Sequence, residues 1–212
     1  MVLRDGREIP VAEFGGRKVR ALLRILATRR GAFVSHDALT DMLWGDQPPA
    51  DPVANLQVLV NRARRALGRP DLIVTGPAAY SLAAAADCVV DAEEFLDALS
   101  AAGEMDADDG LSAYVAALDE WGGEPLAEDA YAGWASEYRD RLTRSRQQAL
   151  ENAARLALDL GEQAQAVELA ATAAAAEPLR EIAVLTLVRA LAAAGDRVAA
   201  LERYEQYRRA LA

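Results

Sequence analysis

The sequence of 212 residues is poor in the side chains that carry metal, redox and disulfide chemistry. It contains one cysteine and one histidine, which excludes an intramolecular disulfide and the usual zinc-ligand sets of several Cys and His residues. It also holds no phosphate loop, dinucleotide fingerprint or nucleophile elbow. We therefore expect no metal, no cofactor and no enzymatic activity.

Long apolar runs are absent as well. No stretch approaches the roughly 20 apolar residues that a helix needs to cross a bilayer. The first ten residues, MVLRDGREIP, lack the basic start and the apolar stretch of a signal peptide. A cytoplasmic protein without a membrane partner is expected. The hydrophobic share of 52% against 26% charged residues is typical of a globular chain with a sizeable core.

The net charge of −10 conceals two parts of opposite sign. Residues 1–86 hold 12 basic and 8 acidic residues, a net charge of +4. Residues 87–212 hold 11 basic and 25 acidic residues, a net charge of −14. Such an asymmetry indicates an anionic partner for the first part alone.

Residues 1–86 combine short strand signals with three helical patterns. The stretch VLRDGREIPVAEF predicts a hairpin that turns at Asp5-Gly6, and a second hairpin is expected around Gly76-Pro77. Between them, helices are expected at about 17–30, after an N-cap at Ser35, and after an N-cap at Asp51. This order of strands, three helices and a hairpin is typical of a winged helix-turn-helix.

The third of these helices includes NLQVLVNRARRALG at 55–68. One face is apolar, with Leu56, Val60, Ala63 and Leu67 at helical spacing. The other side carries Asn55, Gln57, Val58, Asn61, Arg62, Arg64 and Arg65. That side could be an ordinary solvated helix end, since cations are favourable near a helix C-terminus. The neighbouring helix, turn and hairpin favour instead a surface that lies against an anion.

From residue 87 onward the pattern is helical, with almost no strand signal. LDLGEQAQAVEL at 158–169 and LAAAGDRVAALER at 191–203 align at a spacing of 34 residues, with Gly161 over Gly195. That spacing is the tetratricopeptide period, one helix-turn-helix per repeat. Because two repeats are too few to stand alone, helices within 91–157 should complete the core. Trp121 and Trp134 could face a partner or lie in this helical core, and we favour the core.

A resemblance to a known family rests on two parts of the chain. The first is GRKVRALLRILATRRGAFVSHDALTDMLWGDQPPADPVANLQVLVNRARRALG, followed by Tyr80-Ser81-Leu82. This part resembles the DNA-binding domain of the Streptomyces antibiotic regulatory proteins, which is a variant of the OmpR-type winged helix. The second is DEWGGEPLAEDAYAGWASEYRDRL at 119–142 with the repeats behind it. It resembles the bacterial transcriptional activation domain of that family.

The resemblance implies a mainly α chain with small β elements, divided into a winged-helix DNA-binding domain at 1–86 and an all-helical, tetratricopeptide-like activation domain at 87–212. It also implies the function, a sequence-specific activator of antibiotic biosynthesis genes. Such an activator binds direct repeats near the promoter −35 element as a tandem dimer and recruits RNA polymerase. Double-stranded DNA is then the main partner, and the protein is expected to be associated with the nucleoid.

The major groove of B-DNA admits one α-helix and presents a distinct pattern of donors and acceptors for each base pair. For base readout we single out Gln57, Val58, Asn61 and Arg62. For phosphate contacts and the wing we single out Arg64, Arg65, Thr75 and Tyr80. Arg64 could instead hold the wing in place.

A second interpretation stays open, in which the chain is a tetratricopeptide-like protein-interaction module with weak or vestigial DNA binding. Two features favour it: the acidic net charge, and a second hairpin without an arginine at its tip.

Overall fold

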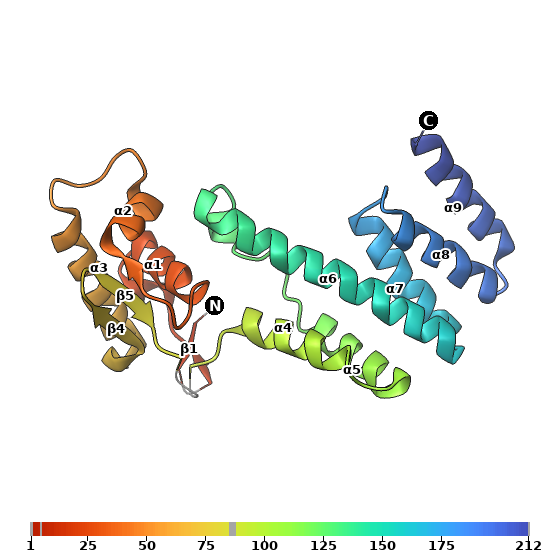
Figure 1. Cartoon of the computed structure of the whole chain (residues 1–212), viewed down its shortest axis with the longest axis horizontal. Coiled ribbons are helices and arrows are strands. Elements are labelled where there is room, and N and C mark those ends of the chain that lie inside the picture. Colours follow the sequence, from red (N-terminus) through yellow and green to blue (C-terminus); the bar gives the residue numbers. More distant parts are fainter. Residues whose placement is uncertain (1, 5, 85–87, 212) are drawn as a thin grey trace. The chain divides into compact units, whose positions relative to one another are not determined.

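The computed structural model describes residues 2–4, 6–84 and 88–211, which are mainly α-helical with small β elements, as expected (Figure 1). They divide into two compact units, each discontinuous in sequence. Unit 1 comprises Met1–Val90 and Leu126–Arg139, and unit 2 comprises Asp91–Pro125 and Asp140–Ala212. The domain boundary expected between residues 86 and 87 lies outside the described residues. The division at that point therefore remains a prediction.

Unit 1 begins with the expected hairpin, in which β1 (Leu3–Arg4) pairs antiparallel with β2 (Arg7–Glu8). Of its two turn residues, Asp5 lies outside the described part of the chain. The strand expected beyond it is wrong, because Val11–Phe14 forms a 3-10 helix, η1. Pro10 enters this turn with φ −56° and has no N–H group to donate to a β ladder.

Three helices follow in unit 1: α1 (Arg17–Ala27), α2 (His36–Trp44) and α3 (Pro52–Leu67). Both predicted N-caps are confirmed. The Ser35 hydroxyl accepts a hydrogen bond from the Ala38 N–H, and Asp51 Oδ1 accepts one from the Ala54 N–H at 2.9 Å. Each cap satisfies one of the N–H groups that the first turn of a helix leaves without a partner.

Helix α1 ends three residues before the expected Arg30. The N–H groups of Arg29 and Arg30 bond to the carbonyls of Leu26 and Ala27, three residues back rather than four. The last turn is therefore of the tighter 3-10 type, which is common at helix ends.

A three-stranded sheet completes unit 1, in the order β3 (Val34–Ser35), β5 (Ala79–Leu82), β4 (Ile73–Gly76), with both pairings antiparallel. Strands β4 and β5 are the predicted second hairpin, preceded by the 3-10 helix η2 (Pro70–Leu72). Strand β3 was not expected, because its two residues lie directly before the N-terminus of α2. Its pairing makes β5 the central strand of the sheet.

The core of unit 1 forms where the apolar faces of its helices and sheet meet. Each helix contributes fully buried aliphatic side chains, and the sheet adds its own: Leu22, Ile25, Leu26, Leu39, Leu56, Val60 and Ile73. Cys88 is half-buried against this core, as a small hydrophobic residue would be. Trp134 packs there too. The expectation that Trp134 lies in the helical core is therefore wrong.

The remaining helices are α4 (Asp91–Ala102), α5 (Ala107–Asp119), α6 (Gly133–Leu160), α7 (Gln163–Ala176), α8 (Glu181–Ala193) and α9 (Arg197–Ala210). The sequence division between the units falls within α6, and the 3-10 helix η3 (Ala127–Asp129) belongs to unit 1. Among the helices described, none combines the length and the apolar character needed to cross a membrane.

The core of unit 2 confirms that the earlier helices complete the repeats. Leu111 and Tyr114 of α5 pack in one cluster with Ala153 of α6, Ala166 of α7 and Ala190 of α8. Trp121, which follows the end of α5, is half-buried. Its ring lies 5.1 Å from that of Phe95, and the Arg146 guanidinium lies 5.3 Å from its centre.

The two predicted repeats have the same backbone hydrogen bonds at their turns. Gly161 and Gly195 adopt φ values of 81° and 88°. The residue after each glycine donates its N–H to a carbonyl five residues back, Glu162 to Ala157 at 2.8 Å and Asp196 to Leu191 at 2.9 Å. Every one of these positions is offset by 34 residues. The period read from the sequence is thus a structural repeat, with α7 equivalent to α9.

Because left-handed backbone conformations cost about 1–2 kcal/mol for residues with a Cβ atom, we expect Gly161→Ala and Gly195→Ala each to destabilise unit 2 by about that amount. Urea unfolding followed by circular dichroism measures the change. Gly122→Ala is the matched control, since its added Cβ meets open space and its φ lies outside the left-handed region. A loss as large in Gly122→Ala would contradict this account of the turns.

Candidate nucleic-acid interface

Helix α3 has one buried and one exposed side, as its sequence predicts. Leu56, Val60 and Ala63 are buried in the core of unit 1, together with Leu59 and Ala66. All four residues singled out for base readout are exposed: Gln57, Val58, Asn61 and Arg62. No hydrogen bond or ion pair to another described residue engages their side chains. The structure therefore brings these four together on one open surface.

The C-terminal end of α3 is the cationic part of this surface. Arg65 is exposed there beside Arg62, close to the partial negative charge of the helix end. The first hairpin adds Arg4, whose guanidinium donates to the Ala66 carbonyl at 3.3 Å. Arg4 was missed in the sequence, because it lies 62 residues from its partner and no local pattern connects the two.

Arg64 joins α3 to the wing, defined here as the β4–β5 hairpin. Its Nη2 donates to the Ile73 carbonyl and, at 2.9 Å, to the Thr75 hydroxyl. The alternative role considered for Arg64, holding the wing in place, is therefore confirmed. Thr75 is exposed but accepts this bond, and the turn beyond it consists of Pro77 and Ala78. The wing is thus positioned from α3 itself.

Tyr80 does not face outward. It is only 4% exposed, packs in the core of unit 1 and stacks on His36 with ring centroids 5.0 Å apart. Tyr80 shares its face of the central strand β5 with Leu82, which is also buried. We therefore remove Tyr80 from the candidate DNA contacts. His36 itself is half-buried in this stacked pair.

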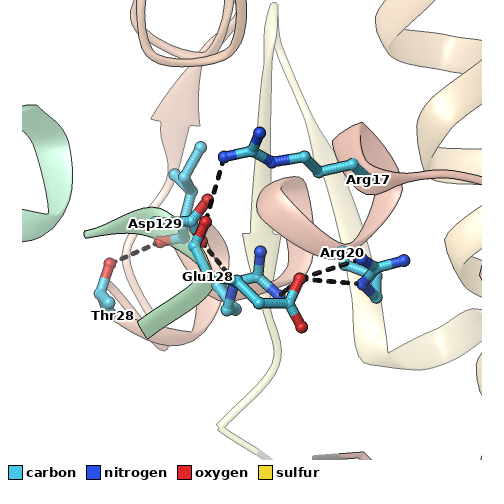
Figure 2. A network of polar contacts seen from close by, with 7 residues as sticks. Arg17, Arg20, Thr28, Glu128 and Asp129 are labelled. Carbon is cyan, nitrogen blue, oxygen red and sulfur yellow. Dashed lines mark hydrogen bonds and ion pairs between the residues drawn. The ribbon is translucent and has the colours of Figure 1, made fainter. Parts of the chain in front are cut away.

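A segment from the second part of the sequence, Leu126–Arg139, packs on unit 1. Figure 2 shows the side chain of Glu128 facing Arg20 of α1, while Arg17 of the same helix reaches the Glu128 backbone. Arg20 donates to Glu128 Oε2 from Nε at 3.2 Å and from Nη2 at 3.0 Å, and Arg17 donates to the Glu128 carbonyl at 3.1 Å. The contact is therefore both charged and hydrogen-bonded.

Arg24 completes this contact. Its Nε donates to Asp129 Oδ2 at 2.5 Å, and its Nη1 lies 3.3 Å from Glu128 Oε2. Asp129 is only 4% exposed, so its charge depends on Arg24 for compensation. We call Arg17, Arg20 and Arg24 the α1 arginine stripe, because their spacing of three and four residues places them on one side of the helix.

The stripe also sets the ionisation of Glu128. Burial alone would raise the pKa of its carboxyl group, but the hydrogen bond from Arg20 and the charges of Arg24 and Arg20 outweigh that effect. The pKa of Glu128 is therefore held below its ordinary value. A lowered pKa in the folded state means that the carboxylate stabilises unit 1 once the pH exceeds the unfolded-state value.

The α1 arginine stripe is paired with acidic residues, and this pairing determines which positive charges of unit 1 stay available to a partner. Including Leu126–Arg139, unit 1 holds 13 basic and 12 acidic residues, a net charge of +1. The arginines of α1 are occupied by Glu128 and Asp129, whereas Arg62 and Arg65 remain exposed. The exposed side of α3 therefore keeps the positive charge of Arg62 and Arg65 available. No group of three or more His, Cys, Asp or Glu side chains that could hold a metal ion occurs in the part of the chain described.

Two family models match the chain. The model described as "Bacterial transcriptional activator domain" matches residues 90–212, more than half of the chain. The model described as "Transcriptional regulatory protein, C terminal" matches residues 15–78, which contain α1, α2, α3 and the start of the wing.

Similar proteins were found among curated sequences and solved structures. Regulatory protein AfsR of Streptomyces coelicolor is 33% identical over 213 residues, 99% of this chain and 21% of that protein. Regulatory protein AfsR of Streptomyces griseus is 33% identical over 206 residues, 93% of this chain and 20% of that protein. The chain thus spans about a fifth of the length of these relatives.

Among solved structures, Mycobacterium tuberculosis EmbR in complex with a low affinity phosphopeptide has a TM-score of 0.82. The match covers 98% of this chain and 56% of that one, at 23% identity. At this identity the likeness supports the fold alone.

Replacing Glu128 by glutamine should lower the melting temperature of unit 1, because the charge that pairs with the stripe is lost. The difference from the wild type should be full at pH 7 and down to about pH 4.5, the ordinary value for this group, and should shrink as the pH falls further. Differential scanning calorimetry over this pH range measures it. Glu137→Gln replaces an exposed carboxylate of the same segment; it is the control and should leave the melting temperature at pH 7 unchanged.

Replacing Arg64 by methionine should cost about 1–3 kcal/mol, because the Ile73 carbonyl and the Thr75 hydroxyl lose their donor. Amide hydrogen exchange in β4 and β5 should accelerate at the same time. Arg65→Met removes the same charge one residue along, from an exposed side chain, and serves as the control. Equal exchange rates of the wing in both variants would contradict the role given to Arg64.

Proposed function

Because the chain belongs to the family of the Streptomyces antibiotic regulatory proteins, which join an OmpR-type winged helix to a bacterial transcriptional activator domain, we propose that it is a sequence-specific DNA-binding activator of transcription. The observation that carries this proposal is the exposed amide and guanidinium surface of α3, backed by a buried apolar face. No catalytic step is part of the proposed function.

In the proposed complex, α3 enters the major groove. Gln57 and Asn61 offer amides, which suit the donor and acceptor pair of adenine, while Val58 meets a thymine methyl group. Arg62 reaches a guanine edge or a phosphate. These contacts read the sequence, whereas phosphate contacts set the register of the protein on the duplex.

Arg65 and the wing residue Thr75 make the proposed phosphate contacts, with Arg64 acting through its hold on the wing. With Arg62 and Arg65 as the exposed cations of this surface, we expect about two neutralised phosphates per copy, hence a slope of roughly −2 when log affinity is plotted against log salt concentration. Because unit 1 has a net charge of only +1, its long-range attraction to DNA is weak. The proposed binding therefore relies on contacts that α3 makes at short range.

Two copies bound in tandem on direct repeats near the −35 element would add the affinity that one copy lacks. We further propose that the acidic residues of unit 2 keep that unit away from DNA, because like charges repel, and leave it to recruit RNA polymerase.

The second candidate function is a protein-interaction module with weak DNA binding. The observation that favours it is the wing tip of Pro77 and Ala78, which offers no charge to the minor groove. The two candidates differ in salt dependence and base specificity. Titrations of a direct-repeat promoter duplex and of a scrambled duplex, each at two salt concentrations, distinguish them. Equal affinity for both duplexes favours the interaction module.

The double variant Asn61→Ala, Arg62→Ala should lose about 2 kcal/mol or more of specific binding energy, roughly 30-fold in affinity, because two base contacts are removed. Fluorescence anisotropy with the promoter duplex measures the loss. Both side chains are exposed, so the melting temperature should stay unchanged.

The matched control is Gln206→Ala, Arg197→Ala, which removes one amide and one arginine from exposed positions of α9. It should bind the promoter duplex as the wild type does. If the α3 double variant kept wild-type specific affinity, α3 would have no part in base reading.

A further inference from the structure

The outward side of α3 carries two rows of exposed side chains, and within each row the residues are spaced by four. One row consists of Val53, Gln57, Asn61 and Arg65, and the other consists of Ala54, Val58 and Arg62. Both rows change in chemical character along the helix. The residue nearest the N-terminus of each row is aliphatic, whereas the last residue of each row is an arginine.

The aliphatic side chains at the N-terminal end of this surface are open to water. Val53 is 43% exposed, Val58 is 48% exposed and Ala54 is exposed as well. Valine is a weaker helix former than alanine or the straight-chain polar residues, because its branched Cβ loses rotamer freedom in a helix. The stability of α3 therefore does not explain two valines on its outward side.

The one polar side chain in the first turn of α3 is tied to the helix cap. Asn55 is the only polar residue between Pro52 and Leu56, and its Nδ2 donates to the Asp51 carbonyl at 2.8 Å. The amide donors that remain on the outward side, those of Gln57 and Asn61, begin one turn later. A base edge that faces the first turn thus meets aliphatic groups.

We propose, building on the proposed function, that Val53 is a specificity-determining residue, which acts together with Val58 by contacting the C5-methyl groups of two thymines. Thymine is the base that presents a methyl group in the major groove. Helix-turn-helix proteins place the N-terminal residues of the reading helix against base edges, which is where both valines lie.

Ala54 supports this arrangement through its size and its place. At about 100° of rotation per residue, Ala54 lies between the two valines on the helix surface. Its side chain ends at the Cβ atom, so the backbone of α3 can come close to the bases. The DNA that this surface fits has two A·T pairs beneath the N-terminal half of α3, beside the pairs that the amides and arginines contact.

The test replaces thymine by uracil, which removes the C5-methyl group and keeps the hydrogen-bonding groups of the base. Duplexes that the full chain retains from a random-sequence pool supply the binding site, and each thymine of that site is replaced in turn. Fluorescence anisotropy measures the affinity for every duplex. We expect two positions at which uracil weakens binding about fourfold, the effect of one methyl group removed from an apolar contact.

Val53→Ala should abolish the effect of uracil at one of these positions, and Val58→Ala should abolish it at the other. Each substitution removes the methyl groups that the thymine contacts, so a double-mutant cycle between residue and base isolates the contact. Val198→Ala is the matched control, because Val198 is 69% exposed and is the second residue of α9, as Val53 is of α3. This variant should keep both effects.

The outcomes separate this proposal from the proposed function. Enriched sequences with fewer than two uracil-sensitive positions overturn the thymine contacts and leave sequence-specific binding in place. Effects that persist at both positions in either α3 variant do the same. A pool that yields no enriched sequence contradicts the proposed function itself, and the thymine contacts fall with it.

Discussion

The burial of one face of α3 is the constraint on which the candidate interface depends. Full burial of a Leu or Val side chain is worth about 1.5–3 kcal/mol, and α3 buries Leu56, Val60 and Ala63 in a single stripe. Because a helix turns once in 3.6 residues, this burial fixes which side chains point outward. Gln57, Asn61 and Arg62 are exposed for that reason. Their chemistry is then free of any role in holding the fold together.

The arginines of α1 and α3 have three different uses, and the use depends on their partners. The α1 arginine stripe binds the acidic pair Glu128 and Asp129. Arg64 holds the wing through a backbone carbonyl and a hydroxyl. Arg62 and Arg65 remain exposed. Composition alone counts all of these as positive charge, whereas the structure leaves only part of that charge available to an anionic partner.

Features set by neighbouring residues could be predicted from the sequence. The N-caps Ser35 and Asp51 act within three residues, and the 34-residue repeat lies in the chain itself. The exposed face of α3 followed from helical spacing. Strand β3 and the place of Tyr80 could not be predicted in the same way. Tyr80 is covered because β5 is a central strand, and that depends on a pairing with two residues far away in the sequence. The contacts of Arg4 and of Glu128 are equally non-local.

The membership of Leu126–Arg139 in unit 1 bears on how the chain folds during its synthesis. Domains generally begin to fold as their N-terminal residues leave the ribosome, at about 5–20 residues per second. When the residues up to Val90 have emerged, Arg17, Arg20 and Arg24 still lack their partners Glu128 and Asp129. Trp134, which packs against the core of unit 1, has not yet been made. Only after about fifty more residues, some seconds later at these speeds, can the winged helix reach its final packing, and by then α4 and α5 have already been made.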